Sequence, residues 1–301
     1  MFTHALKVDN ESSGERIDIY LFQHLPDASS RSYVKRLIDS GHVKIAEKSI
    51  KPNYKVLAGE EILVEIPEDF HTPQYVEPEN IPLNIFYEDD QLIIVNKPSG
   101  MLVHPATGCY TGTLVNALLH HSLQLSDFNS HMRAGIVHRL DQDTSGLMVV
   151  AKDNITHTKL GKQFERHQVK KKYVALVEGE LAFDEGVISA PIGRHPHNRE
   201  KKAVQFDDDQ ARSAETVYKV LKRKKDATLV ALFPKTGRTH QLRVHMAYQR
   251  HPILGDVKYG KESTFPRLAL HAQSIGFKHP MTKCYCEFST VIPKEFLDRV
   301  K

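Results

Sequence analysis

The segment Gly135–Gly146 places an aspartate between two short apolar runs. Ile136-Val137 comes before it and Leu147–Val150 follows, and their apolar, largely β-branched composition predicts two buried strands joined by a polar loop. Within this loop Asp141 follows the first strand closely, where a carboxylate can serve as a nucleophile or a general base. The alternative is an aspartate that bonds to the backbone of the following turn. We assign Asp143, two residues further on, to this structural use.

Other segments with chemically active side chains follow in order along the chain. They are Val95–Gly100 with His104-Pro105, Lys171–Gly179, Thr236–His245, His251–Asp256 and Leu270–Ala272. Together with Gly135–Gly146 they resemble the RNA pseudouridine synthases that modify large-subunit ribosomal RNA. An ordered set of matches is far more specific than any single short motif. The resemblance implies an isomerase that converts uridine to pseudouridine, with RNA as its partner and no cofactor.

The resemblance also implies roles for the central residues. Asp141 becomes the catalytic carboxylate, and Arg243 matches the position whose guanidinium pairs with it. Such a charge-assisted bond would keep the carboxylate ionised in a dry pocket. Tyr173 is expected to lie against the target base. Without the resemblance, a surface helix arginine and a half-buried strand tyrosine are ordinary interpretations, and the sequence leaves open whether Asp141 attacks the ribose, attacks the base or removes a ribose proton.

Several further residues are expected to contact RNA. Arg139 is expected to face away from the pocket of Asp141 and to point into the RNA, where it helps to hold a nucleotide displaced by base flipping. Leu242 is expected near the flipped base, and His138 is expected to orient the loop rather than to transfer protons. Residues 194–202 resemble the basic, RNA-facing loop of the family. Phosphate contacts are expected from Lys97, Arg238, His240 and the lysines at 170–172.

Charge divides the chain into two parts. Residues 1–75 hold nine Lys and Arg against twelve Asp and Glu, whereas residues 76–301 hold 32 against 25. The region between them is interrupted by Pro67, Pro73, Pro78 and Pro82. Helices and strands do not easily continue through prolines. We therefore predict two domains, 1–75 and 76–301, joined by a linker near residues 68–82.

The first part has the features of a small α+β RNA-binding domain. Ser29-Ser30 is expected to cap a helix over about residues 30–40, and Gly41 is expected to end it. Three basic residues cluster on this helix although the part is acidic overall: Arg31, Lys35 and Arg36. Such residues are often merely solvated. Here, however, the surrounding segments resemble the alpha-L type RNA-binding domain, so we interpret the cluster as a phosphate-facing surface.

The second part is predicted to be rich in strands. Strands are expected over residues 92–95, 135–137, 147–151, 173–177, 227–232 and 284–290, with helices over 157–166 and 238–246. Hairpin-like segments with interspersed helices favour a mixed, mostly antiparallel sheet in an α+β domain over a doubly wound parallel sheet. The resemblance implies the same fold, with an RNA cleft crossing the sheet.

Composition argues against several other classes of protein. Cys109, Cys284 and Cys286 do not suit a disulfide framework, and neither their spacing nor that of the 18 histidines predicts a metal site. The N-terminus lacks a signal-peptide core, and no apolar run approaches the roughly 18 to 20 residues of a membrane span. We therefore expect a cytoplasmic protein without a membrane partner, and we take it to be a monomer.

Two other functions stay open from the residues alone. Asp141 with Asp143 could serve a glycoside hydrolase or a nuclease, since paired carboxylates support acid–base and metal chemistry. That alternative leaves Tyr173 and Arg243 without a role. A catalytically silent RNA-binding protein would also explain the charge distribution. Transfer RNA is an alternative substrate, because the choice of target depends on RNA shape.

Overall fold

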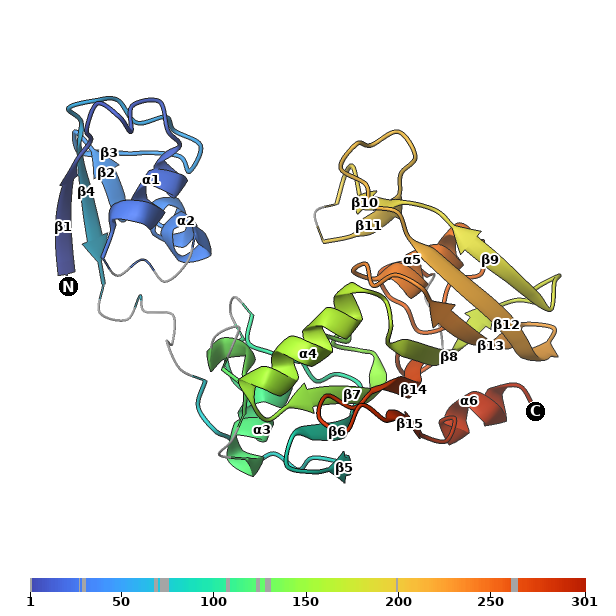
Figure 1. Cartoon of the computed structure of the whole chain (residues 1–301). Helices are drawn as coiled ribbons and strands as arrows, with labels where there is room; N and C mark the ends of the chain where they lie inside the picture. Colours follow the sequence, from blue (N-terminus) through green and yellow to red (C-terminus); the bar gives the residue numbers. More distant parts are fainter. Residues whose placement is uncertain are drawn as a thin grey trace. The chain divides into compact units, whose positions relative to one another are not determined.

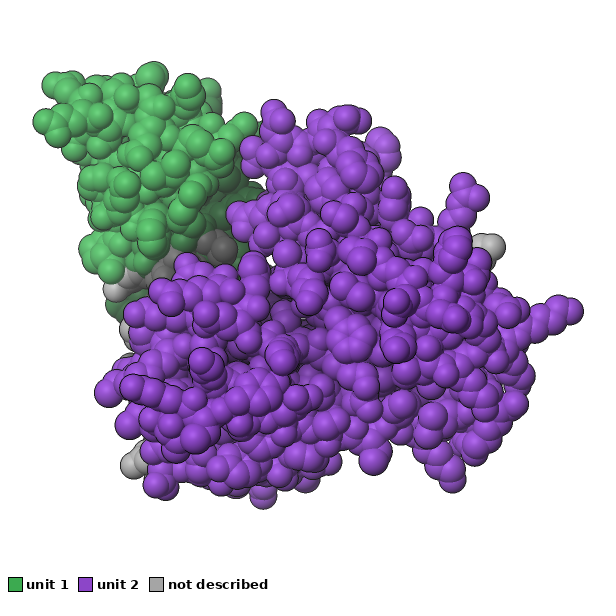
Figure 2. All heavy atoms as spheres, turned by 45° about the vertical axis from the view of Figure 1, so that its right-hand side comes forward, with its two compact units in different colours: residues 1–75 green, residues 76–301 purple. Residues whose placement is uncertain are grey.

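The chain forms two compact units, Met1–Tyr75 and Val76–Lys301 (Figure 2). The structure is a computed structural model that describes residues 2–26, 28, 31–67, 70, 76–106, 109–122, 125–127, 131–198, 200–260 and 265–301. Ser29 and Ser30, which were expected to cap a helix, lie outside the described residues, as does part of the expected linker. Each unit has a hydrophobic core of its own.

The first unit packs two helices against a four-stranded antiparallel sheet of order β1-β4-β2-β3. Its elements are β1 (Phe2–Lys7), α1 (Ile17–His24), α2 (Arg31–Asp39), β2 (Val43–Ile45), β3 (Lys48–Ser49) and β4 (Glu61–Ile66). Val34, Leu37 and Ile38 of α2 are buried, which follows the helical spacing of these apolar residues. Gly41 adopts the left-handed conformation that ends a helix, with φ of +77°.

A mixed sheet of nine strands frames the second unit (Figure 1). Eight strands lie in the order β5-β6-β7-β14-β8-β13-β12-β9, and β15 pairs with β14. These strands are β5 (Ile85–Glu88), β6 (Leu92–Lys97), β7 (Ser145–Ala151), β8 (Lys170–Glu178), β9 (Glu185–Ser189), β12 (Glu215–Lys224), β13 (Ala227–Pro234), β14 (Leu270–Lys278) and β15 (Tyr285–Ser289). β7 and β14 pair in parallel, and the other described pairs are antiparallel. The predicted mixed, mostly antiparallel sheet is confirmed.

Helices cover this sheet, and a short hairpin extends from it (Figure 1). The helices are α3 (Leu114–His121), α4 (Asn154–Glu165), α5 (Gln241–Tyr248) and α6 (Lys294–Arg299), and the hairpin pairs β10 (Ile192–Arg194) with β11 (Lys202–Val204). A short 3-10 turn spans His131–Arg133. α3 begins at a capping box between Thr113 and Asn116, and α4 begins where the Asp153 carboxylate accepts a bond from Thr156 N.

Alternate residues of β6 serve two different cores. Ile93 and Val95 pack in a cluster that includes α3, whereas Leu92 and Ile94 pack in a cluster that includes Leu160 of α4. Successive side chains of a strand point to opposite faces, so a strand that is covered on both faces is apolar throughout. The continuous apolar sequence of β6 therefore reflects burial on both sides.

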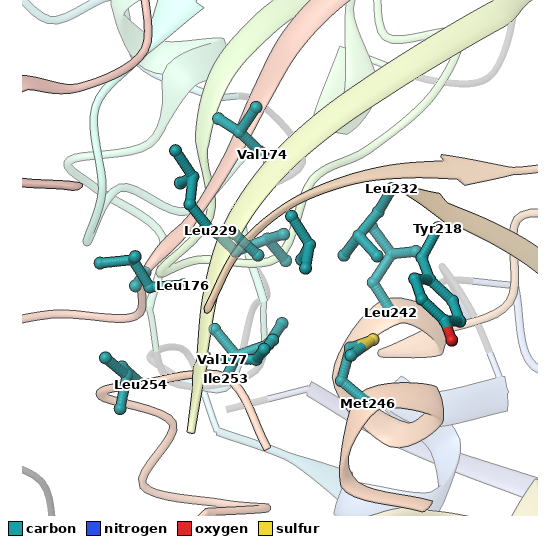
Figure 3. Close-up of a cluster of buried hydrophobic side chains, with 14 of the residues drawn as sticks. Val174, Leu176, Val177, Tyr218, Leu229, Leu232, Leu242, Met246, Ile253 and Leu254 are labelled. Atoms are coloured by element: carbon teal, nitrogen blue, oxygen red, sulfur yellow. The ribbon is translucent and has the colours of Figure 1, made fainter. Parts of the chain in front are cut away.

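The largest core lies where β8, β13 and α5 meet. Leu242 and Met246 of α5 point toward Leu232 and Tyr218 (Figure 3). Burial of each such side chain contributes roughly 1.5–3 kcal/mol. This packing fixes the helix that carries Arg243.

Residues 135–137 do not form the strand that the sequence predicted. Ile136 makes a single bridge to Val150 of β7. Gly135 is left-handed, with φ of +71°, and a Cβ at this position would lie 2.6 Å from a Val150 methyl group. The chain therefore leaves the sheet after one bridge, and His138–Asp141 forms an irregular segment that leads into β7.

Candidate active site

A pocket of about 340 Å³ opens around Asp141. Its lining comes mainly from three segments that lie far apart in the sequence, residues 138–144, 164–173 and 234–243. Its volume falls within the range of small-ligand sites, and its walls combine apolar side chains with a few polar groups. The pocket is therefore large enough to receive a flipped nucleotide base.

Asp141 and Arg243 face each other in this pocket. Arg243 Nη1 donates a hydrogen bond of 3.3 Å to Asp141 Oδ2. The Asp141 side chain is 20% exposed, and that of Arg243 is 4% exposed. Burial alone would lower the pKa of Arg243, but its bonds to Asp256 and the charges of Asp256 and Asp141 raise this pKa above its ordinary value. Arg243 thus presents a full positive charge to Asp141.

A second, fully buried carboxylate holds Arg243 from the other side. Arg243 Nε and Nη2 donate bonds of 2.7 and 2.8 Å to the two oxygens of Asp256. Asp256 Oδ1 also accepts bonds from the backbone N–H groups of Lys258 and Tyr259. Such a bidentate bond fixes the plane of a guanidinium, and here it leaves Nη1 for Asp141.

His240 lies beside the same carboxylate. Its Nε2 is 3.9 Å from Asp141 Oδ2, and its Nδ1 is 2.7 Å from the Tyr259 hydroxyl. Burial lowers the pKa of His240 more than the charge of Asp141 raises it. The residue precedes α5 in the left-handed conformation, with φ of +56°. The structure therefore places His240 at Asp141, whereas the sequence suggested a phosphate contact.

Tyr173 and Lys171 come from one face of β8 and line the pocket. Tyr173 pairs with Leu232 of β13 and is half-buried. Burial, with a smaller contribution from the charge of Asp141, raises the pKa of the Tyr173 phenol above its usual range. Burial lowers the pKa of Lys171. A protonated phenol therefore lies in the same pocket as Asp141.

His138 ties the segment before Asp141 to the sheet. Its Nε2 accepts a hydrogen bond of 3.1 Å from Val149 N of β7. Its ring stacks on Phe164 with a centroid distance of 4.5 Å. Burial, reinforced by Lys171, lowers the pKa of His138 to about 3, so the ring is neutral at neutral pH. The contacts of this histidine are those of a structural anchor.

Three other predicted contact residues also line the pocket: Arg139, Leu242 and Arg238. The expectation that Arg139 faces away from the pocket was wrong, because residues 138–141 form an irregular segment in which adjacent side chains line the same pocket. Leu242 is 6% exposed and also belongs to the main core. Arg238 Nε donates to the Ser213 carbonyl at 3.1 Å.

Lys97 is not available to bind a phosphate. It is fully buried, and its Nζ donates three bonds of 2.8 Å to the carbonyls of Pro98, Met101 and Gln142. Burial lowers the pKa of Lys97 to about 8, despite the opposing charges of Asp143 and Asp141. The sequence suggested a phosphate contact, but the side chain instead bonds the backbone beside Asp141 to the turn after β6.

The structure does not bring Asp143 into the pocket with Asp141. Asp143 is exposed, and its carbonyl accepts a bond of 2.7 Å from Ser99 Oγ. Asp256 does lie close to the site, but both of its oxygens bind Arg243. An acid–base pair formed by Asp141 and Asp143, as a glycoside hydrolase or nuclease would need, is therefore not supported.

The basic residues of α2 differ in their surroundings. Arg31 Nη2 donates to the buried Asp18 carboxylate at 2.9 Å. The guanidinium carbon of Arg36 lies 5.7 Å from the centre of the Phe70 ring. Lys35 is exposed. Arg31 thus neutralises a buried carboxylate in addition to any contact that it makes with RNA.

Among the described residues, no three His, Cys, Asp or Glu side chains are grouped as metal ligands would be. In the same part of the chain, no helix combines the length and the apolar character that crossing a bilayer requires.

No role was expected for Asp256 or Tyr259 from the sequence. Asp256 ends one of the motifs in the sequence, and an acidic residue in such a motif is a usable signal. Tyr259 carries no comparable signal, because its contacts with His240 and with Lys202 of β11 join segments that are distant in the sequence.

Both units match known protein families. Residues 91–248 match the family described as RNA pseudouridylate synthase, and residues 15–62 match the S4 domain. An uncharacterized RNA pseudouridine synthase of Bacillus subtilis (strain 168) is 42% identical over 298 residues, which cover 98% of this chain and 96% of the relative. A ribosomal large subunit pseudouridine synthase D of Zymomonas mobilis is 39% identical, with coverage of 98% and 96%.

The fold also has solved counterparts. Human RNA pseudouridylate synthase domain containing 1 aligns with a TM-score of 0.61 and 26% sequence identity. The alignment covers 74% of this chain and 88% of that chain. These findings agree with the resemblance carried by the sequence motifs.

Proposed function

This chain belongs to the RNA pseudouridylate synthase family, and from this premise we propose that Asp141 is its catalytic carboxylate. The protein is an RNA pseudouridine synthase, an isomerase that acts on RNA. The observation that carries the assignment of Asp141 is its position in the pocket beside the buried Arg243.

The reaction breaks the bond between the ribose C1′ and N1 of uracil and joins C1′ to C5 of the same ring. The proton that leaves C5 is balanced by a proton that N1 gains, so substrate and product are isomers. No electrons are gained or lost, so the residues of the pocket suffice. Asp141 acts as the nucleophile or the base, and Arg243 keeps it ionised and oriented. Tyr173 offers its ring to the uracil, while Arg139 and Leu242 border the place of the flipped nucleotide.

We propose large-subunit ribosomal RNA as the substrate. Support comes from relatives named ribosomal large subunit pseudouridine synthase D that are 39% and 38% identical over nearly the whole chain. The first unit, residues 1–75, is proposed to bind RNA outside the pocket, supported by its S4 match. The basic segment 194–202 between β10 and β11 adds a second RNA contact, although Arg199 lies outside the described residues. The enzyme is proposed to act as a monomer in the cytoplasm.

Pseudouridine mapping of ribosomal RNA tests this proposal. In cells that lack the protein, we expect defined sites in the large-subunit RNA to lose pseudouridine. The wild-type chain restores them and the Asp141→Asn variant does not. An unchanged map would reject the substrate, and rescue by Asp141→Asn would reject the role of the carboxylate.

A further inference from the structure

Tyr259 joins three parts of the catalytic unit through its hydroxyl group and its ring. Its oxygen accepts a bond of 2.8 Å from Lys202 N of β11 and lies 2.7 Å from His240 Nδ1. Its ring packs against Arg243, whose Cζ lies 5.1 Å from the ring centre. Tyr259 therefore contacts the basic hairpin, the histidine beside Asp141, and the arginine that binds Asp141.

The bonds around this hydroxyl favour one position for the ring proton of His240. The Tyr259 oxygen accepts the Lys202 N–H, so its own proton needs an acceptor, which His240 Nδ1 provides. Nε2 then carries the ring proton, and this nitrogen faces Asp141 Oδ2 at 3.9 Å. Both ends of the imidazole thus favour the same tautomer.

The backbone and charge of His240 are consistent with this arrangement. Its φ of +56° is uncommon for a residue other than glycine, and such strain is found where a side chain must be aimed. Burial keeps the pKa of the ring below its usual value, so at neutral pH an N–H dipole rather than a full charge faces Asp141. An N–H dipole stabilises an ionised carboxylate without cancelling its charge.

We infer that Tyr259 and His240 are positioning residues that aim a neutral Nε2–H at Asp141 and link the β10–β11 hairpin to this carboxylate. A second contact strengthens the link, since Lys258 Nζ lies 3.6 Å from Glu200 Oε2 of the hairpin loop. The inference rests on the proposed role of Asp141. It goes beyond that role because it predicts that RNA bound to the hairpin affects the position of His240 beside Asp141 through the Tyr259 hydroxyl group.

The tautomer can be observed without any activity measurement. Long-range ¹H–¹⁵N correlation spectra of histidine-labelled protein distinguish the two tautomers, and His240→Asn identifies the signals of His240. We expect the proton on Nε2 in the wild type and a loss of this preference in Tyr259→Phe. A proton on Nδ1 in the wild type would overturn the inference.

Kinetics test the link to catalysis. Tyr259→Phe removes one oxygen atom and keeps the ring on Arg243. We expect kcat to fall about tenfold while KM for RNA changes by less than about twofold, as for the loss of one hydrogen bond used in the reacting complex. Tyr218→Phe, at a buried tyrosine of β12 that does not line the pocket, should leave kcat unchanged.

The outcomes separate this inference from the proposed function. An inactive wild type would reject the function while the spectra still report the tautomer. An active wild type with an equally active Tyr259→Phe variant would reject the link alone.

Discussion

Arg243 contacts two carboxylates whose surroundings differ. The side chain of Asp256 is fully buried and that of Asp141 is 20% exposed at the pocket, so the first anchors the guanidinium and the second remains open to a substrate. The sequence motifs predicted that Asp141 and Arg243 pair, and their side chains do form a hydrogen bond. The anchoring role of Asp256 could not be predicted, because spacing along the chain does not show which side chains converge. The same limit explains why Lys97, which is fully buried, was wrongly expected to contact a phosphate.

Loss of the anchor should destabilise the protein. Asp256→Asn leaves a buried guanidinium with one charged partner in place of two, and removing one member of a buried pair costs about 3–5 kcal/mol. We expect the free energy of unfolding to fall by an amount of this order, together with kcat. Denaturant unfolding measures it, with the exposed Asp209→Asn as control. An unchanged unfolding midpoint in Asp256→Asn would contradict the anchoring role.

At the scale of elements, the parallel pair β7 and β14 is the least predictable feature. The apolar sequences of both strands predict burial, but nothing local shows that Gly146 will lie opposite Ala272. The hairpin-like segments were enough to predict the mostly antiparallel sheet, whereas residues 135–137 were mistaken for a strand. This segment makes only the bridge from Ile136 to Val150 of β7, and Gly135 before it is left-handed. The hydrophobic pattern of the sequence shows neither feature.

Gly146 should be intolerant of a side chain. Its φ is +120°, and a Cβ there would lie 2.3 Å from the Ala272 carbonyl oxygen. We therefore expect Gly146→Ala to reduce the melting temperature strongly or to prevent soluble expression. Gly161→Ala in α4 is the matched control, because a Cβ there meets nothing within 4 Å, and it should add roughly 0.5–1 kcal/mol of stability. Equal melting temperatures for both variants would contradict this account of the β7–β14 contact.

His271 should make the stability of the central strands depend on pH. Its ring nitrogens bond to Ser145 Oγ at the start of β7 and to Thr290 Oγ1 just after β15. Burial, with the charge of Arg267, lowers the pKa of His271 to about 4. Between pH 6.5 and about 4 the unfolded chain binds a proton at this position and the folded chain does not, so stability falls as pH falls through this window.

Urea unfolding between pH 7.5 and 4.5 measures this effect. The decline in stability should be shallower for His271→Gln than for the wild type, whereas the exposed His197→Gln should decline like the wild type. Parallel curves for His271→Gln and the wild type would show that this histidine does not contribute.

At the scale of the whole molecule, charge and structure divide the chain at the same place. The boundary between the compact units falls between residues 75 and 76, and the sequence has a net negative charge before this boundary and a net positive charge after it. The assignment of one domain to each side of this boundary stays a prediction from composition and proline positions. The RNA that each unit contacts cannot be derived in this way, because it depends on the shape of the partner.

The first unit should affect RNA binding more than catalysis. Replacing Lys35 and Arg36 by Gln removes two positive charges from α2. We expect KM for a ribosomal RNA fragment to rise and kcat to stay constant. The slope of the logarithm of the binding constant against the logarithm of the salt concentration should decrease in magnitude by about one to two, the amount expected for the loss of one to two phosphate contacts. Lys51→Gln, an exposed change in the same unit, is the control. A lower kcat with unchanged KM would count against a binding role for this unit.

The most direct test of the central claim compares purified wild type and Asp141→Asn on transcribed large-subunit ribosomal RNA. Pseudouridine formation and RNA binding are measured on the same preparations, with unfolding curves to verify the fold. We expect Asp141→Asn to bind the RNA like the wild type and to form at least about a thousandfold less pseudouridine, as expected when an essential group is removed. Pseudouridine formation by Asp141→Asn at the wild-type rate would contradict the assignment of Asp141 as the catalytic carboxylate.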